Sequence, residues 1–141
     1  AMTNSNIRSG DLVLVVDDDG DALDEIADVL RDMELIVLTA LNGEDAVKLA
    51  RENRPDYVLM DYSLPGINGL VAVRTMRYFL PDTIFIMMSG LDDFCRVATT
   101  NNTMTFAILK KPLAINGIAR FIRNKSQYNP PNMTVVDLLT S

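Results

Sequence analysis

Aspartates gather directly after apolar runs in this 141-residue chain. Asp17, Asp18 and Asp19 follow one such run, and Asp61 follows another. Crowded carboxylates repel one another and need a cation, and Mg²⁺ prefers oxygen ligands from carboxylates, water and phosphate. An aspartate can also act as a nucleophile that takes up a phosphoryl group. These acids therefore indicate a metal-assisted phosphoryl transfer.

Two further apolar runs end in groups that suit the same chemistry. Ser89 follows residues 84–88, and Lys110-Lys111-Pro112 follows residues 105–109. A hydroxyl can hydrogen-bond a phosphoryl oxygen, and a lysine can stabilise its negative charge. Taken singly, each residue has an ordinary structural explanation, and we expect Asp19 and Asp21 to be helix caps. The agreement of four strand ends favours the functional interpretation.

The elements that must position these groups alternate between strand and helix. Continuous apolar runs predict buried strands at residues 12–16, 35–38, 57–60, 84–88 and 105–109. Apolar residues at helical spacing predict helices within residues 23–33, 42–55, 70–81, 91–101 and 115–125, with Asn42 as an N-cap. We therefore expect an α/β fold with a doubly wound, five-stranded parallel sheet and helices on both faces. Ligands of such sheets bind beyond the carboxyl ends of the strands.

The composition argues against several classes of function. A net charge of −6 argues against nucleic-acid binding by this chain, because phosphate contacts need clustered Lys and Arg. The absence of histidine excludes a self-contained phosphohistidine step. Cys95 is the only cysteine, which fits a reducing compartment. No apolar run approaches the roughly 20 residues of a membrane span, so we expect a cytoplasmic protein without membrane contact.

The motifs together resemble the response-regulator receiver family over about residues 11–126. Val15-Val16-Asp17-Asp18-Asp19 resembles the family's acidic pair, and residues 58–69 resemble its phosphoacceptor segment. Met88-Ser89-Gly90 matches the switch hydroxyl, and Leu109-Lys110-Lys111-Pro112 matches the lysine-proline signature. We expect residues 1–10 to be disordered. Residues 127–141, which include Met133 to Leu139, would be a tail with a short added element or the start of a linker.

The resemblance implies a flavodoxin-like sheet of strand order 2-1-3-4-5 and a two-component phosphorelay switch rather than an enzyme. Asp61 would be the phosphoacceptor, assisted by Lys111 and Ser89. Mg²⁺, for which Mn²⁺ can substitute, would be held by Asp17, Asp18, Asp61 and the backbone carbonyl of Ser63. The donor would be a phosphohistidine on a sensor histidine kinase or a histidine phosphotransfer protein. A homodimer through the last helices is a further expectation.

Two alternatives stay open. Residues 16–23 also resemble the first motif of haloacid-dehalogenase-type phosphohydrolases, in which Asp17 would be the nucleophile. The second alternative is a pseudo-receiver, which binds partners without being phosphorylated. One departure from the family is Ile108, which stands where an aromatic residue often couples to the switch hydroxyl, so the usual aromatic readout is expected to be altered or absent.

Overall fold

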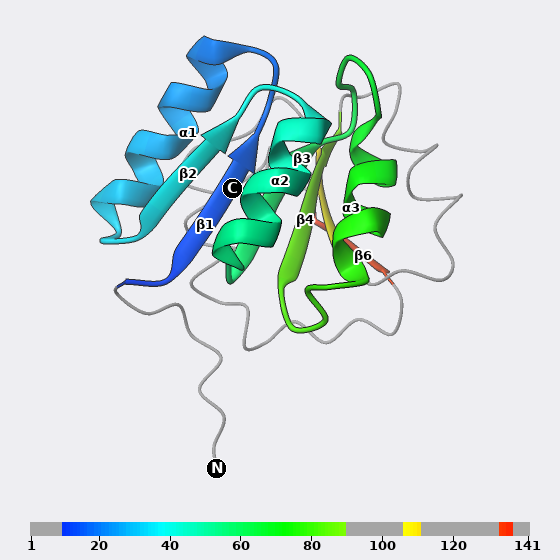
Figure 1. Cartoon of the computed structure of the whole chain (residues 1–141). Coiled ribbons are helices and arrows are strands. Elements are labelled where there is room, and N and C mark those ends of the chain that lie inside the picture. The colour runs from blue at the N-terminus through cyan, green and yellow to red at the C-terminus, as the bar shows by residue number, and fades with distance from the viewer. Residues whose placement is uncertain (1–9, 90–105, 111–132, 137–141) are drawn as a thin grey trace.

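The chain forms a twisted parallel sheet flanked by helices (Figure 1). The computed structural model describes residues 10–89, 106–110 and 133–136. Within these residues the elements run in the order β1 (Leu12–Val16), α1 (Gly20–Asp32), β2 (Ile36–Ala40), α2 (Gly43–Asn53), β3 (Tyr57–Asp61), α3 (Gly69–Arg77), β4 (Ile84–Ser89), β5 (Phe106–Lys110) and β6 (Met133–Val136). The helices predicted within residues 91–101 and 115–125 and the dimer through the last helices lie outside the described residues. The same is true of residues 1–9 of the segment 1–10, which was predicted to be disordered.

In the described part of the chain the sheet has six strands in the order β2-β1-β3-β4-β5-β6, and every neighbouring pair is parallel. The predicted order of the first five strands is confirmed. The sixth strand, β6, falls in the predicted tail and pairs with β5 from Phe106↔Met133 to Leu109↔Val136. The sequence left two possibilities for residues 133–139, a short added element or the start of a linker. Residues 133–136 form the short added element.

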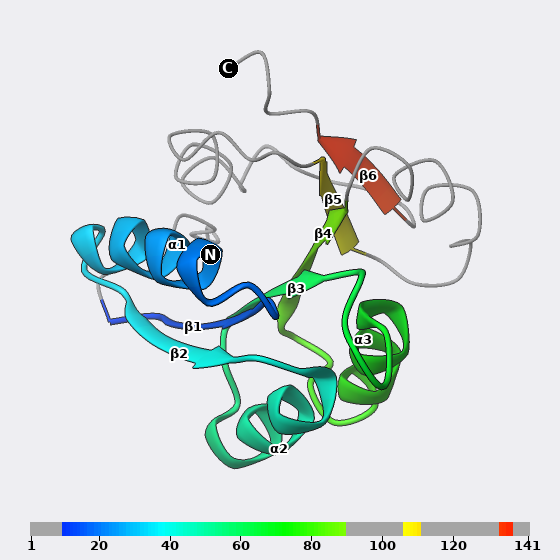
Figure 2. The ribbon, with the colours of Figure 1, turned by 90° about the horizontal axis from the view of Figure 1, so that it is seen from above.

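The central strands are buried on both faces, as their continuous apolar sequences predict. On one face Val13 and Val15 pack in a cluster with α1 residues such as Leu23 and Leu30. On the other face Leu14 and Val16 pack with residues of α2 and α3. Figure 2 shows α1 on one side of the sheet and α2 and α3 on the other. β1 therefore crosses the core, and the charged residues that follow it lie at the edge of the core.

The helices begin at side-chain caps that the sequence largely indicates. Asp19 caps α1, its Oδ1 accepting from the N–H groups of Asp21 (3.1 Å) and Ala22 (3.3 Å). The prediction that Asp21 is also a cap is wrong, because Asp21 already lies in the first helical turn, where its charge favours the helix dipole. Asn42 caps α2 as predicted, accepting from the N–H of Asp45 (2.8 Å). No helix in the described part of the chain is long and apolar enough to span a bilayer.

Candidate functional site

Three carboxylates meet at the carboxyl edge of the sheet. β1 and β3 are parallel neighbours with Val16 opposite Met60, so the residues that follow, Asp17 and Asp61, end side by side. One carboxylate oxygen from each of Asp17, Asp18 and Asp61 lies within 4.8 Å of the others. The residues predicted to bind a metal through their side chains are thus brought together.

The two strand-end carboxylates differ in exposure from the third. Asp17 is 1% exposed and Asp61 is 4% exposed, whereas Asp18 is open to solvent. Like charges at this separation repel, and the repulsion is stronger where water is excluded. A hard divalent cation with oxygen ligands would neutralise such a cluster, so the donor set fits Mg²⁺.

Backbone amides orient the buried pair. The N–H of Asp19 donates to Oδ1 of Asp17 (3.0 Å), and the N–H of Ser63 donates to Oδ1 of Asp61 (3.2 Å). Each bond joins an aspartate to the amide two residues ahead, the local turn that aspartate side chains favour after a strand. The chain immediately after each strand therefore fixes the direction of its own carboxylate.

The loop from residue 61 to residue 69 folds back against the strand that it leaves. The N–H of Tyr62 donates to the carbonyl of Met88 on β4 (2.8 Å), and the N–H of Gly69 donates to the carbonyl of Tyr62 (2.9 Å). A Cβ at position 69 would overlap the backbone carbonyl oxygen of Asp61. Gly69 was predicted only as a loop residue, and its close approach to the site becomes visible in the folded chain.

The remaining predicted site residues are placed by their strands. Ser89 is the last residue of β4, one residue beyond the pair Asp61↔Met88. Its register partner is Lys110, the last residue of β5. Lys111 lies outside the described residues, and it follows Lys110 directly in the chain. The strand ends thus share one edge, and the roles of Ser89, Lys111 and the Ser63 carbonyl remain predictions.

The fold and the acidic pocket define a class of protein, namely flavodoxin-like α/β proteins with a carboxylate cluster beyond the carboxyl ends of β1 and β3. Within that class, the chain belongs to the response regulator receiver domain family, whose sequence model matches residues 13–123. The resemblance seen in the motifs is therefore confirmed.

Relatives and solved structures agree with this assignment. The chain is 44% identical over 83 residues to the response regulator GacA of Pseudomonas aeruginosa, covering 57% of this chain and 39% of GacA. It is 38% identical over 84 residues to the transcriptional regulatory protein PrrA of Mycobacterium tuberculosis, covering 57% of this chain and 36% of PrrA. The chain thus spans well under half the length of these relatives.

The fold is similar to that of solved receiver domains. A receiver domain from Clostridium thermocellum superposes with a TM-score of 0.71 at 24% identity, covering 81% of this chain and 92% of that one. The chemotaxis protein CheY4 of Vibrio cholerae superposes with a TM-score of 0.68 at 22% identity, covering 80% and 96%. These likenesses establish the flavodoxin-like fold.

Proposed function

We propose that Asp61 accepts a phosphoryl group from a phosphohistidine on a sensor histidine kinase or a histidine phosphotransfer protein. The carboxylate oxygen of Asp61 forms the new O–P bond while the N–P bond of the donor breaks and its electron pair returns to the imidazole. The approach of the three carboxylates to within 4.8 Å at the sheet edge is the observation that carries this proposal.

The same cluster supports a magnesium site. Asp17, Asp18 and Asp61 would hold Mg²⁺, or Mn²⁺ in its place, together with the backbone carbonyl of Ser63. The bound cation supplies charge neutralisation for the carboxylates and the incoming phosphoryl group. The hydrogen bond from the N–H of Ser63 would orient the Asp61 carboxylate for the proposed attack.

Ser89 and Lys111 complete the proposed phosphoryl site. Lys111 would stabilise the charge of the transferred group, and the Ser89 hydroxyl would donate a hydrogen bond to one of its oxygens. Movement of Ser89 toward Asp61 would shift an existing equilibrium between two conformations, so the chain would act as a switch that catalyses its own phosphorylation and dephosphorylation. The output that reads the switch would belong to the longer protein or to a separate target.

Acetyl phosphate with Mg²⁺ tests this proposal without a partner kinase. We expect intact-mass spectrometry to show the addition of one phosphoryl group to the wild type, and none to Asp61→Asn. Asp56→Asn is the matched control, because Asp56 lies just before the opposite end of the same strand, where its carboxylate accepts from the N–H of Leu12. Equal labelling of Asp61→Asn and the wild type would overturn the assignment.

The two alternative functions predict different outcomes in the same experiment. A phosphohydrolase with Asp17 as nucleophile would release phosphate in steady turnover, and Asp17→Asn would abolish that turnover while Asp61→Asn kept it. A pseudo-receiver would form no adduct with acetyl phosphate and none with beryllofluoride. Stoichiometric labelling at Asp61 followed by slow loss is the result that we expect.

A further inference from the structure

The outer edge of β2 presents backbone hydrogen-bonding groups that pair with no other strand among the described residues. β2 is the terminal strand of the sheet, and β1 is its one neighbour among the described residues. The N–H of Ile36 donates to Asp11 (2.9 Å), and the carbonyl of Ala40 accepts from Asp17 (3.2 Å), so both residues bond toward β1. Along a parallel strand, successive residues bond to opposite sides. The strand therefore directs the N–H and C=O groups of Val37 and Thr39 outward.

This edge lacks the usual protection against further pairing. Natural edge strands carry charges, proline or bulges that discourage another strand from adding to the sheet. The sequence of β2 is IVLTA, with neither a charge nor a proline, and its register with β1 is continuous over all five residues. Ile36 at its start is 55% exposed, and Leu41 just beyond its end is 53% exposed.

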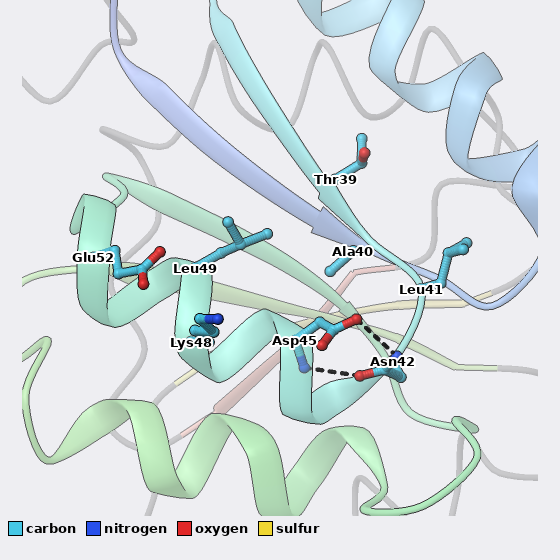
Figure 3. A pocket seen from close by; sticks show the side chains of 8 residues that line it. All are labelled: Thr39, Ala40, Leu41, Asn42, Asp45, Lys48, Leu49 and Glu52. Atoms are coloured by element: carbon cyan, nitrogen blue, oxygen red, sulfur yellow. Dashed lines mark hydrogen bonds between the residues drawn. The ribbon is translucent and has the colours of Figure 1, made fainter.

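A groove lies beside the second half of the same strand. It has a volume of about 490 Å³ and runs between the end of β2 and helix α2 (Figure 3). Its lining residues are Thr39, Ala40, Leu41, Asn42, Asp45, Lys48, Leu49 and Glu52. In Figure 3 the side chains of Thr39 and Ala40 point to opposite sides of β2, and Leu49 reaches toward the strand from α2.

We propose that β2 pairs with β2 of a second copy of this chain, antiparallel, about a two-fold axis at Leu38. In that register Val37 faces Thr39 of the second copy, and Thr39 faces Val37 of the second copy. Both residues direct their backbone groups outward, so each pair exchanges two hydrogen bonds and four bonds join the sheets. In this register every outward N–H and C=O group of Val37 and Thr39 has a partner in the other copy.

The same register seats an apolar side chain in each groove. Ile36 of one copy lies opposite Ala40 of the other, and directly opposed side chains project from the same face of a sheet. Ile36 and Ala40 are an even number of residues apart, so both project toward the α2 face, where Ala40 lines the groove. The exposed Ile36 therefore enters the apolar part of the groove beside Leu49.

Self-complementarity is the reason to assign a second copy as the occupant. One strand supplies both the side chain that inserts and the groove that receives it, which is the condition for an isologous two-fold interface. Two five-residue strands make a small interface, so we expect a weak dimer. The axis also places both α1 helices over one face of the joined sheet. Their exposed acids, among them Asp24 and Glu25, would repel, so added NaCl should strengthen the dimer.

Sedimentation equilibrium of the full chain tests the dimer. We expect Ile36→Lys to raise the Kd about a hundredfold, because two Ile36 side chains leave the interface and each is worth roughly tenfold or more. The matched control is Tyr78→Lys, because Tyr78 is an 85% exposed apolar residue that lies outside both β2 and the groove. Circular dichroism checks that the variants remain folded. A chain that stays monomeric at all concentrations, or a dimer insensitive to Ile36→Lys, overturns the proposal.

Disulfide trapping tests the register independently of affinity. In a Cys95→Ser background, Leu38→Cys should cross-link across the axis, because a directly opposed, non-hydrogen-bonded pair has Cα atoms about 4.5 Å apart. Ile36→Cys should not, because its opposite residue is Ala40 and not a second Ile36. Equal cross-linking at the two positions, or none at Leu38, would contradict this pairing.

Discussion

At the scale of single residues, the site brings negatively charged carboxylates close together and orients them through backbone amides. Asp17 and Asp61 are buried and their carboxylates lie close together, so their negative charges repel one another. Their positions could be predicted from the sequence because Asp17 directly follows the apolar strand β1 and Asp61 ends the apolar strand β3. The amides of Asp19 and Ser63 that orient them follow from the turns, which strand periodicity does not specify.

Magnesium should stabilise the wild type and have little effect on Asp61→Asn. Removing one of three mutually repelling charges should raise the Tm of Asp61→Asn above that of the wild type in EDTA. A cation that binds only the folded state adds about 2.7 kcal/mol at a hundred times its Kd. Thermal unfolding with and without MgCl₂ measures both effects, with Asp56→Asn as control. The same Mg²⁺-dependent shift in Asp61→Asn and wild type would contradict the metal site.

Tyr57 should make the fold sensitive to alkaline pH. Burial raises the pKa of the Tyr57 hydroxyl above its ordinary value of 10.0, and the charges of Asp11 and Asp56 raise it further. Above pH 10 the unfolded chain therefore loses this proton while the folded chain keeps it, so stability falls as pH rises. Urea unfolding between pH 9 and pH 11 should show that the free energy of unfolding falls more steeply with pH for the wild type than for Tyr57→Phe. Identical slopes for the two proteins would exclude this residue as the source.

At the scale of elements, the loop from residue 61 to residue 69, which joins β3 to α3, is held by contacts at the start of α3. Asn68 caps α3 by accepting from the N–H of Val71 (3.0 Å), and Gly69 packs on the backbone of Asp61. The sequence indicated a loop here from its proline and glycines. It could not indicate the close approach, because that contact depends on how α3 packs against β3.

Gly69→Ala should damage both stability and the site. The added Cβ must displace the Asp61 carbonyl or move α3, and overpacking of this kind costs about 1–3 kcal/mol or more. Urea unfolding measures the loss, and acetyl phosphate labelling should slow. Gly20→Ala is the matched control, because a Cβ at Gly20 meets nothing within 4 Å and alanine favours a helix. Equal stability of the two variants would show that the loop can relax freely.

At the scale of the whole molecule, the sheet extends further than the sequence predicts. The order of β2, β1, β3, β4 and β5 follows from strand–helix alternation and the family resemblance. The sequence did not predict β6 as a definite strand. Its four residues follow a proline-rich segment, and they take strand form only against the edge of β5. Similarly, β2 runs from Ile36 to Ala40 rather than over residues 35–38, since its ends are set by pairing with β1.

Removing β6 should weaken the fold and uncover β5. Deletion of residues 133–141 removes a pairing that spans four register pairs, and the lost hydrogen bonds should lower the free energy of unfolding by about 2–4 kcal/mol. Deletion of residues 137–141 alone keeps β6 and is the control. Chemical unfolding compares the two, and light scattering should reveal association of the longer deletion through its bare edge. Equal stability of both deletions would mean that β6 contributes nothing.

The hydrogen bond from the amide of Tyr62 to the carbonyl of Met88 joins the residue after Asp61 to the residue before Ser89. A single hydrogen bond thus joins the peptide group that follows Asp61 to the peptide group that precedes Ser89, the two positions whose coupling defines the proposed switch. Its amide proton should be a sensitive NMR reporter, because a change in the length of that bond alters its chemical shift directly. Titration with beryllofluoride would then follow, at one resonance, how tightly the acceptor strand and its neighbour move together.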